Sequence, residues 1–134
     1  MPVADTELLF ALNPKDPKHV YALRALREVK GLVVPDVAVL EFQAVLRGRG
    51  RTPAQVKAAL LALGQVLSQY GVRGVHTLSI DLFVRQCMIE ETYGLSYFDS
   101  LVAASALAVD GYVVSDDKAF DRVPGLKRIP LTRR

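Results

Sequence analysis

Short runs typical of β-strands alternate with longer segments of helical periodicity along the chain. The strand-like runs lie at 2–4, 32–34, 72–75, 112–115 and 127–130. The segments between most of them place apolar residues every three or four positions, as amphipathic helices do. Strands that alternate with helices in this way form a mostly parallel sheet with helices on both faces. We therefore expect an α/β fold with three layers, α/β/α.

Residues that favour helix ends indicate where several of these helices begin and stop. Thr52 followed by Pro53 is typical of a helix start, and Gly94 is expected to end a helix. The segment from about 98 to 109 is apolar on nearly every side, so it is expected to be a central, tightly packed helix. The apolar faces expected in two other helices are Val20, Leu23, Leu26 and Val29, and Ile80, Phe83, Val84 and Cys87.

Composition restricts the class of protein. The chain has 134 residues, 51% of them hydrophobic, which suits a single domain, 1–134, with a real core. It has no apolar run of roughly 18 residues that could span a bilayer, and no basic leader typical of a signal peptide. The lone Cys87 cannot form an internal disulfide, which favours the cytoplasm, and it is expected to lie in the core. A net charge of +3 is compatible with a polyanionic partner.

Four carboxylates lie beside strongly apolar sequence. Asp5 and Asp117 each follow a strand-like run, Glu41 interrupts the apolar stripe of a helix, and Asp99 opens the apolar helix. Burying such groups is costly unless something pairs with them. Open parallel sheets bind ligands at the carboxyl ends of their strands. If the strands before Asp5 and Asp117 are neighbours, we expect all four carboxylates to face one crevice.

A divalent cation is the partner that suits four acids without a companion base. Ligand sets made only of oxygen favour Mg²⁺ or Mn²⁺ over zinc. The chain has 2 histidines and 1 cysteine, and none adjoins another candidate ligand. An ion held in this way can activate water and neutralise charge on a phosphodiester. The pattern therefore favours metal-assisted hydrolysis.

Each acid also has a purely structural interpretation. Asp5 could cap the first helix, and Asp99 could be a first-turn acid that is favoured by the helix dipole. Glu41 could be a solvated helix residue. Asp116 and Asp117 could both be capping or turn residues. The hypothesis of a metal site depends on the convergence of the four acids.

Basic residues cluster in two places. Arg47, Arg49 and Arg51 alternate with glycines in a loop that could touch a nucleic-acid backbone, although an exposed, solvated loop is the simpler interpretation. Arg133 and Arg134 are expected to form a frayed tail.

The acids and their surroundings, in this order, resemble the PIN-domain family. Val-Ala-Asp-Thr at 3–6 is similar to its opening strand and Asp-Thr pair, and Glu41 is similar to its second acidic position. The segment 97–106, Tyr-Phe-Asp-Ser-Leu-Val-Ala-Ala-Ser-Ala, resembles its third position, an aspartate that leads an alanine-rich helix. The segment 114–120 is similar to its fourth, a Ser or Thr followed shortly by Asp. The resemblance covers almost the whole chain.

The resemblance implies a PIN fold, Mg²⁺ or Mn²⁺ binding and endoribonuclease activity on RNA. The short form looks like the VapC toxins of VapBC toxin–antitoxin pairs, which implies a homodimer or higher homo-oligomer and a cognate antitoxin protein. The positions that carry over are the metal-binding acids Asp5, Glu41, Asp99 and Asp117 and the supporting hydroxyls Thr6 and Ser115.

The chain departs from the family pattern at two points. Glu7 stands where the family often has Asn, which adds a further acid. At the fourth position Asp116 competes with Asp117, and the spacing from Ser115 and to Phe120 favours Asp117 with Asp116 as an accessory.

Two other classes of protein are alternatives to the nuclease. A PIN-like module could bind RNA or a protein without cutting, although it would have no need to keep four acids. A receiver domain for phosphoryl transfer fits poorly, because it would want paired acids after the first strand, where Asp5 is followed by Thr6 and Glu7.

Overall fold

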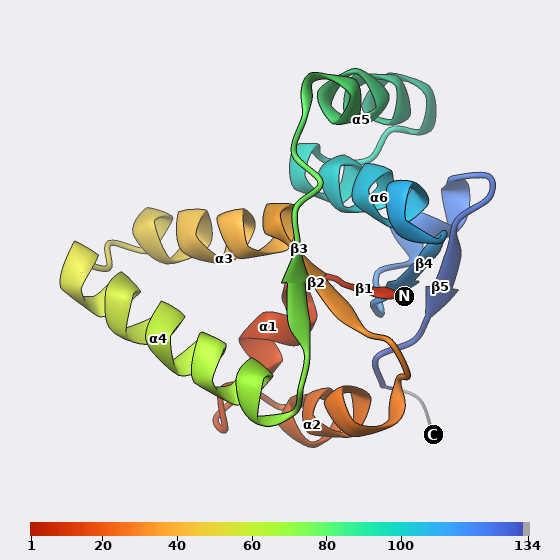
Figure 1. The fold of residues 1–134 in the computed structure, drawn as a ribbon. Helices are drawn as coiled ribbons and strands as arrows, with labels where there is room; N and C mark the ends of the chain where they lie inside the picture. Colours follow the sequence, from red (N-terminus) through yellow and green to blue (C-terminus); the bar gives the residue numbers. More distant parts are fainter. Residues whose placement is uncertain (133–134) are drawn as a thin grey trace.

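The computed structural model describes residues 1–132, so the predicted tail at Arg133 and Arg134 lies outside the described residues. Its centre is one five-stranded sheet in the order β3-β2-β1-β4-β5, with every neighbouring pair parallel (Figure 1). The expected α/β fold with a parallel sheet is therefore confirmed. The strands are β1 Val3–Ala4, β2 Val33–Pro35, β3 Arg73–Val75, β4 Tyr112–Val114 and β5 Lys127–Ile129.

Helices cover both faces of the sheet, as the alternation of elements predicts. Helices α5 and α6 lie on one face, α1 and α2 lie on the other, and α3 and α4 extend together away from the sheet (Figure 1). The helices are α1 Thr6–Ala11, α2 His19–Glu28, α3 Asp36–Gly48, α4 Pro53–Gln69, α5 Ile80–Tyr93 and α6 Tyr97–Val109, with a 3₁₀ helix, η1, at Lys118–Arg122.

The central strands divide their side chains between two cores, because successive residues of a strand point to opposite faces. Val3 pairs with Val113 in register, and both pack with α6. Ala4 pairs with Val114, and both pack with α1 and α2. Residues 100–106 of α6 are all buried, as expected for the apolar central helix. This register places the residues that follow β1 and β4 side by side.

Two of the predicted helix ends are confirmed in detail. Thr52 Oγ1 accepts from the backbone N–H of Gln55 at 3.2 Å, and Gln55 Oε1 accepts from the backbone N–H of Thr52 at 2.9 Å, which completes a capping box. Gly94 ends α5 at φ 70°, in the left-handed region where a side chain would be strained.

The predicted apolar face of α5 is not the buried one. Ile80 is 82% exposed, Val84 is 55% exposed, and Cys87 is exposed rather than in the core. Helix α5 instead packs against α6 through Leu82, Gln86 and Ile89. The prediction from apolar periodicity was wrong because the polar side chain of Gln86 lies on the buried face of α5. Its Nε2 donates to Ser100 Oγ on α6 at 3.0 Å.

The predicted apolar face of α2 is also only partly correct. Helix α2 buries Ala22, Ala25 and Leu26, whereas Val20 is 72% exposed. The short helix α1 follows β1 directly, where the capping interpretation of Asp5 places a helix. In β4, Tyr112 is exposed while Val113 and Val114 are buried. Among residues 1–132, no helix is long and apolar enough to cross a bilayer.

Candidate metal and active site

Asp5 lies where β1 ends and α1 begins. Its Oδ1 accepts from the backbone N–H of Thr6 at 2.8 Å, and its Oδ2 accepts from Ser115 Oγ at 2.7 Å. The side chain is therefore a helix cap, as the structural interpretation allowed, and it also faces the end of β4. Burial raises the pKa of Asp5 to about 7, although hydrogen bonds from Ser115 and Thr6 oppose the rise.

Glu41 projects from α3 toward α1. Thr6 Oγ1 donates to Glu41 Oε1 at 2.5 Å, so the hydroxyl that follows Asp5 also orients Glu41. Burial raises the pKa of Glu41, and the Thr6 hydrogen bond partly offsets this. Glu41 is half-buried, which contradicts its interpretation as a solvated helix residue.

Asp99 stands in the first turn of α6, where Ser96 caps the helix by accepting from the backbone N–H of Asp99 at 3.2 Å. Burial and then the nearby charge of Asp117 raise the pKa of Asp99 to about 6. A helix N-terminus ordinarily favours a charged carboxylate. The raised pKa shows that desolvation and crowding with other acids outweigh that effect here.

Asp117 is exposed and opens η1. Its Oδ1 accepts from the backbone N–H of Ala119 at 2.9 Å, and its own backbone N–H donates to Ser115 Oγ at 3.0 Å. Ser115 thus connects the main chain at Asp117 to the carboxylate of Asp5. The proximity of Asp117 to Asp99 brings the end of β4 and the start of α6 to one site.

The four predicted acids come together at the carboxyl edge of the sheet. The charges of Asp99 and Glu41 contribute to the raised pKa of Asp5, and Glu41 and Asp117 contribute to that of Asp99. In the described part of the chain, none of these four forms an ion pair with a lysine or arginine. The arrangement concentrates negative charge that a bound cation would stabilise.

The donor set fits Mg²⁺ or Mn²⁺ in its chemistry, since all the ligands on offer are carboxylate oxygens. Within residues 1–132, no three His, Cys, Asp or Glu side chains are grouped closely enough to hold one metal ion. Mg²⁺ does not need such a group, because it keeps several waters and is usually held by one or two carboxylates. Burial raises the pKa of Asp5 to about 7 and that of Asp99 to about 6, so a bound cation would stabilise the ionised form of both.

Asp116 and Asp117 have different surroundings. Asp116 Oδ2 accepts from Lys18 Nζ at 2.9 Å, and its Oδ1 accepts from the backbone N–H of Thr132 at 3.0 Å. Burial would raise the pKa of Asp116, but the hydrogen bonds from Lys18 and Thr132 lower it. Asp117 lies beside Asp99 instead. The structure therefore places Asp117 beside another of the predicted acids, whereas Asp116 pairs with Lys18.

A family model describes the same chain. The model of the PIN domain matches residues 3–126. The chain belongs to the PIN-domain family. No curated protein matches it by sequence.

Solved structures with similar folds cover nearly all of this PIN domain. VapC20 of Mycobacterium tuberculosis, described as a toxin that cleaves the sarcin–ricin loop, is 19% identical with a TM-score of 0.68, over 90% of this chain and 93% of that one. VapBC2 of Rickettsia felis, bound to a DNA fragment from its promoter, is 19% identical with a TM-score of 0.67, over 96% of each chain. FitAcB of Neisseria gonorrhoeae is 15% identical with a TM-score of 0.66, over 98% of each. These likenesses show a shared fold.

Sequence reasoning missed two features of this PIN domain. Lys18 pairs with both Glu7 and Asp116, and its only sequence signal is a lysine placed just after the rigid Pro17. Asp36 is the first residue of α3. Its carboxylate accepts from the backbone N–H groups of Thr77 and Leu78 at 3.0 and 3.1 Å, so it anchors the segment before α5.

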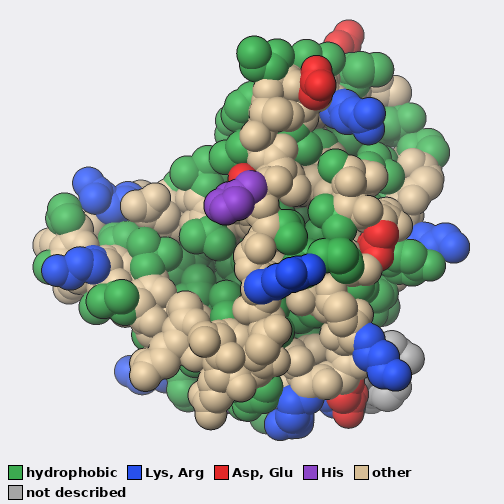
Figure 2. Space-filling view, in the orientation of Figure 1, with side chains coloured by type: hydrophobic (Ala, Val, Ile, Leu, Met, Phe, Trp, Pro, Cys, Tyr) green, Lys and Arg blue, Asp and Glu red, His purple; other side chains and the backbone are tan. Residues whose placement is uncertain are grey.

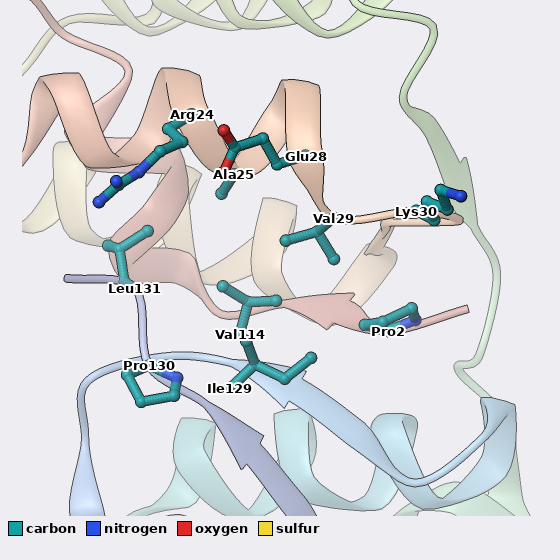
Figure 3. A pocket seen from close by; sticks show the side chains of 10 residues that line it. All are labelled: Pro2, Arg24, Ala25, Glu28, Val29, Lys30, Val114, Ile129, Pro130 and Leu131. Carbon is teal, nitrogen blue, oxygen red and sulfur yellow. The ribbon is translucent and has the colours of Figure 1, made fainter. Parts of the chain in front are cut away.

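Two cavities lie outside the acidic site. One of about 600 Å³ is bordered by α1, α3 and α4, with Phe10, Phe42 and Leu63 among its walls and Arg49 and Arg51 beside them. Figure 2 shows hydrophobic side chains between the arms formed by α3 and α4. A smaller cavity, of about 270 Å³, lies between α2 and the ends of β4 and β5 (Figure 3). None of the four acids lines either cavity.

Proposed function

We propose that this PIN-domain protein is an endoribonuclease that hydrolyses RNA phosphodiester bonds with a bound Mg²⁺ or Mn²⁺. The observation that carries the proposal is the group of four carboxylates at one sheet edge, where burial and the neighbouring acids raise the pKa values of Asp5 and Asp99. Burying unpaired acids costs folding free energy, so a function that uses the charge explains their presence. The similar fold of a toxin described as cleaving the sarcin–ricin loop supports RNA as the substrate.

The residues of the site have distinct parts in this proposal. Asp5 and Asp99 would hold the ion, and Glu41 and Asp117 would complete its negative surroundings. Bound there, the ion would supply positive charge beside the phosphodiester and make a water molecule more acidic. Thr6 orients Glu41, and Ser115 orients Asp5.

Asp99→Asn tests the function directly, because it keeps the shape of the side chain while removing its charge. We expect cleavage of RNA in Mg²⁺ to be lost, and chelation of the metal to abolish cleavage by the wild-type chain. Asp81→Asn, the same change at an exposed acid in the first turn of α5, is the matched control and is expected to cleave normally. Cleavage at the wild-type rate by Asp99→Asn would contradict the proposal.

The alternative of a non-catalytic binding module predicts a different result. RNA would then be retained equally with and without chelator, and no products would form at any metal concentration. That alternative gives no reason for Asp5 to be 5% exposed without a cationic partner among the described residues.

We further propose that the protein is the toxin of a toxin–antitoxin pair. Solved structures with the same fold include a toxin–antitoxin complex from Klebsiella pneumoniae, 17% identical with a TM-score of 0.65 over 94% of this chain and 95% of that one. The cavity between α1, α3 and α4 offers an apolar binding surface for a segment of the antitoxin. Arg49 and Arg51 at this cavity favour acidic residues beside that segment. Ala62→Glu, in that cavity and exposed, is expected to prevent a co-expressed antitoxin from co-purifying.

A homodimer is also part of the proposal, and α5 supplies its surface. Ile80, Val84 and Met88 form one exposed stripe along α5, at 82%, 55% and 61% exposure. In a two-fold antiparallel pair, Val84 meets its own copy while Ile80 meets Met88.

We propose a cytoplasmic location for the protein. Cys87 is a free, exposed thiol, which suits a reducing compartment better than an oxidising one.

A further inference from the structure

Six carboxylates near the ends of β1 and β4 fall into two groups. Asp5, Glu41, Asp99 and Asp117 form no ion pairs within residues 1–132, whereas Glu7 and Asp116 share one lysine. Lys18 Nζ lies 2.7 Å from Glu7 Oε1 and 2.9 Å from Asp116 Oδ2. A single ammonium group therefore bridges two carboxylates that lie far apart in the sequence, as a metal ion would.

Local structure holds Lys18 in this position. Its backbone N–H donates to Asp16 Oδ1 at 2.8 Å, and its carbonyl accepts from the N–H of Ala22 in α2. Pro17 stiffens the turn between Asp16 and Lys18. The side chains of Glu7 and Asp116 are only 25% and 19% exposed, so their charges depend on this ammonium for compensation.

The bridged pair adjoins the four-acid site through one hydroxyl. Ser115 Oγ lies 2.7 Å from Asp5 Oδ2 and 3.3 Å from Glu7 Oε2. A hydroxyl has one proton to donate, and the shorter distance assigns it to Asp5. Glu7 already accepts from Lys18 Nζ at 2.7 Å and from the backbone N–H of Asp116 at 3.3 Å, so the proton of Ser115 is left for Asp5.

We propose that the Lys18 ammonium takes the place of a second divalent ion at this edge, so that the chain binds a single ion through the carboxylates that Lys18 leaves unpaired. The inference rests on the proposed metal-dependent function, and it assigns Lys18 as a positioning residue. Glu7 and Asp116 are acids of the right type beside the site, but their negative charge is already compensated. Without Lys18, they would offer carboxylate oxygens that Mg²⁺ and Mn²⁺ accept as ligands.

The number of bound ions tests the inference without any assay of cleavage. Equilibrium dialysis with Mn²⁺ should give a single ion per wild-type chain, and Lys18→Met should bind one ion more. The triple variant Lys18→Met, Glu7→Gln, Asp116→Asn should return to a single ion, because the released acids are now neutral. Lys57→Met removes the same charge from an exposed position on α4 and should keep the wild-type number.

A second variant serves if Lys18→Met does not fold. Glu7→Gln with Asp116→Asn leaves Lys18 in place and should still bind a single ion, so loss of that ion would overturn the inference. A wild-type chain with two ions, or a folded Lys18→Met chain that gains none, would overturn this inference and leave the proposed function intact. A wild-type chain that binds no ion would overturn both.

Discussion

Ser115 Oγ donates a hydrogen bond to Asp5 Oδ2 over 2.7 Å and joins the ends of two neighbouring strands. The parallel register of β1 and β4 pairs Ala4 with Val114, so the next residue on each strand lies at the same edge. Both side chains are buried, Ser115 completely. The orientation of Asp5, the most buried acid in the candidate site, therefore depends on β1 and β4 being neighbours in the sheet.

Ser115→Ala should weaken both the fold and the site. It removes the hydrogen bond to Asp5 and the acceptor for the backbone N–H of Asp117, which we expect to lower the free energy of unfolding by about 1–3 kcal/mol. Urea denaturation measures this loss. Because the Ser115 hydrogen bond opposes the rise in the pKa of Asp5, that pKa should increase further.

Ser100→Ala is the matched control for this change. Ser100 is also fully buried, and its Oγ donates to the carbonyl of Tyr97 and accepts from Gln86 rather than bonding to one of the four acids. It should show a similar loss of stability with unchanged Mn²⁺ binding, whereas Ser115→Ala should bind Mn²⁺ more weakly. Equal Mn²⁺ affinities in the two variants would show that Ser115 has no role in the site.

Stability of the metal-free chain should fall as pH rises from about 4 to about 7. In this window the folded chain keeps protons on Asp5 and Asp99 that the unfolded chain releases, so higher pH favours unfolding. The slope should approach about 1.4 kcal/mol per pH unit for each such proton. Chemical denaturation across the pH range measures it.

Acids with lowered pKa values act in a different range. The pKa values of Asp36 and Asp116 are lowered, so these residues contribute stability that is lost only as pH falls below the ordinary pKa of an aspartate. Asp5→Asn should therefore flatten the decline between pH 4 and 7, while Asp116→Asn should leave it in place. A stability that rises with pH over this window in the metal-free wild-type chain would contradict the raised pKa values.

Divalent ions should stabilise the folded chain near neutral pH. An ion that binds only the folded state at a concentration 100 times its dissociation constant adds about 2.7 kcal/mol. Thermal denaturation with Mg²⁺ or Mn²⁺ should therefore give a higher Tm, and chelator should reverse the increase. Asp99→Asn should lose the response and Asp81→Asn should retain it, and a retained response in both would place the ion elsewhere.

Val84→Glu should convert the proposed dimer into a monomer. The side chain lies at the centre of the α5 stripe, where two copies would bring the new carboxylates face to face. Light scattering after gel filtration measures the mass. Leu61→Glu, at a 68% exposed position on α4, is the control and should remain dimeric. A monomeric wild-type chain would refute the proposed homodimer.

The order of elements and the positions of the acids were readable from the sequence because they depend on local patterns. Strand-like runs before Asp5 and Asp117 predicted which residues end strands, and Thr52 and Gly94 marked helix ends by their own chemistry. Asp99 could be assigned to a first helical turn for the same reason. Their roles in metal binding and catalysis stay predictions.

The faces of helices and the partners of charges depend on contacts between distant segments. Periodicity alone could not show that α5 buries Gln86 and exposes Val84, because the choice depends on Ser100 across the interface with α6. Spacing favoured Asp117 over Asp116, but it could not show what lies beside each of these two adjacent residues. Lys18, 98 positions away from Asp116 in the chain, neutralises it, while Asp99 crowds Asp117. Local sequence thus specified the acids, and long-range packing determined which of them remain unpaired.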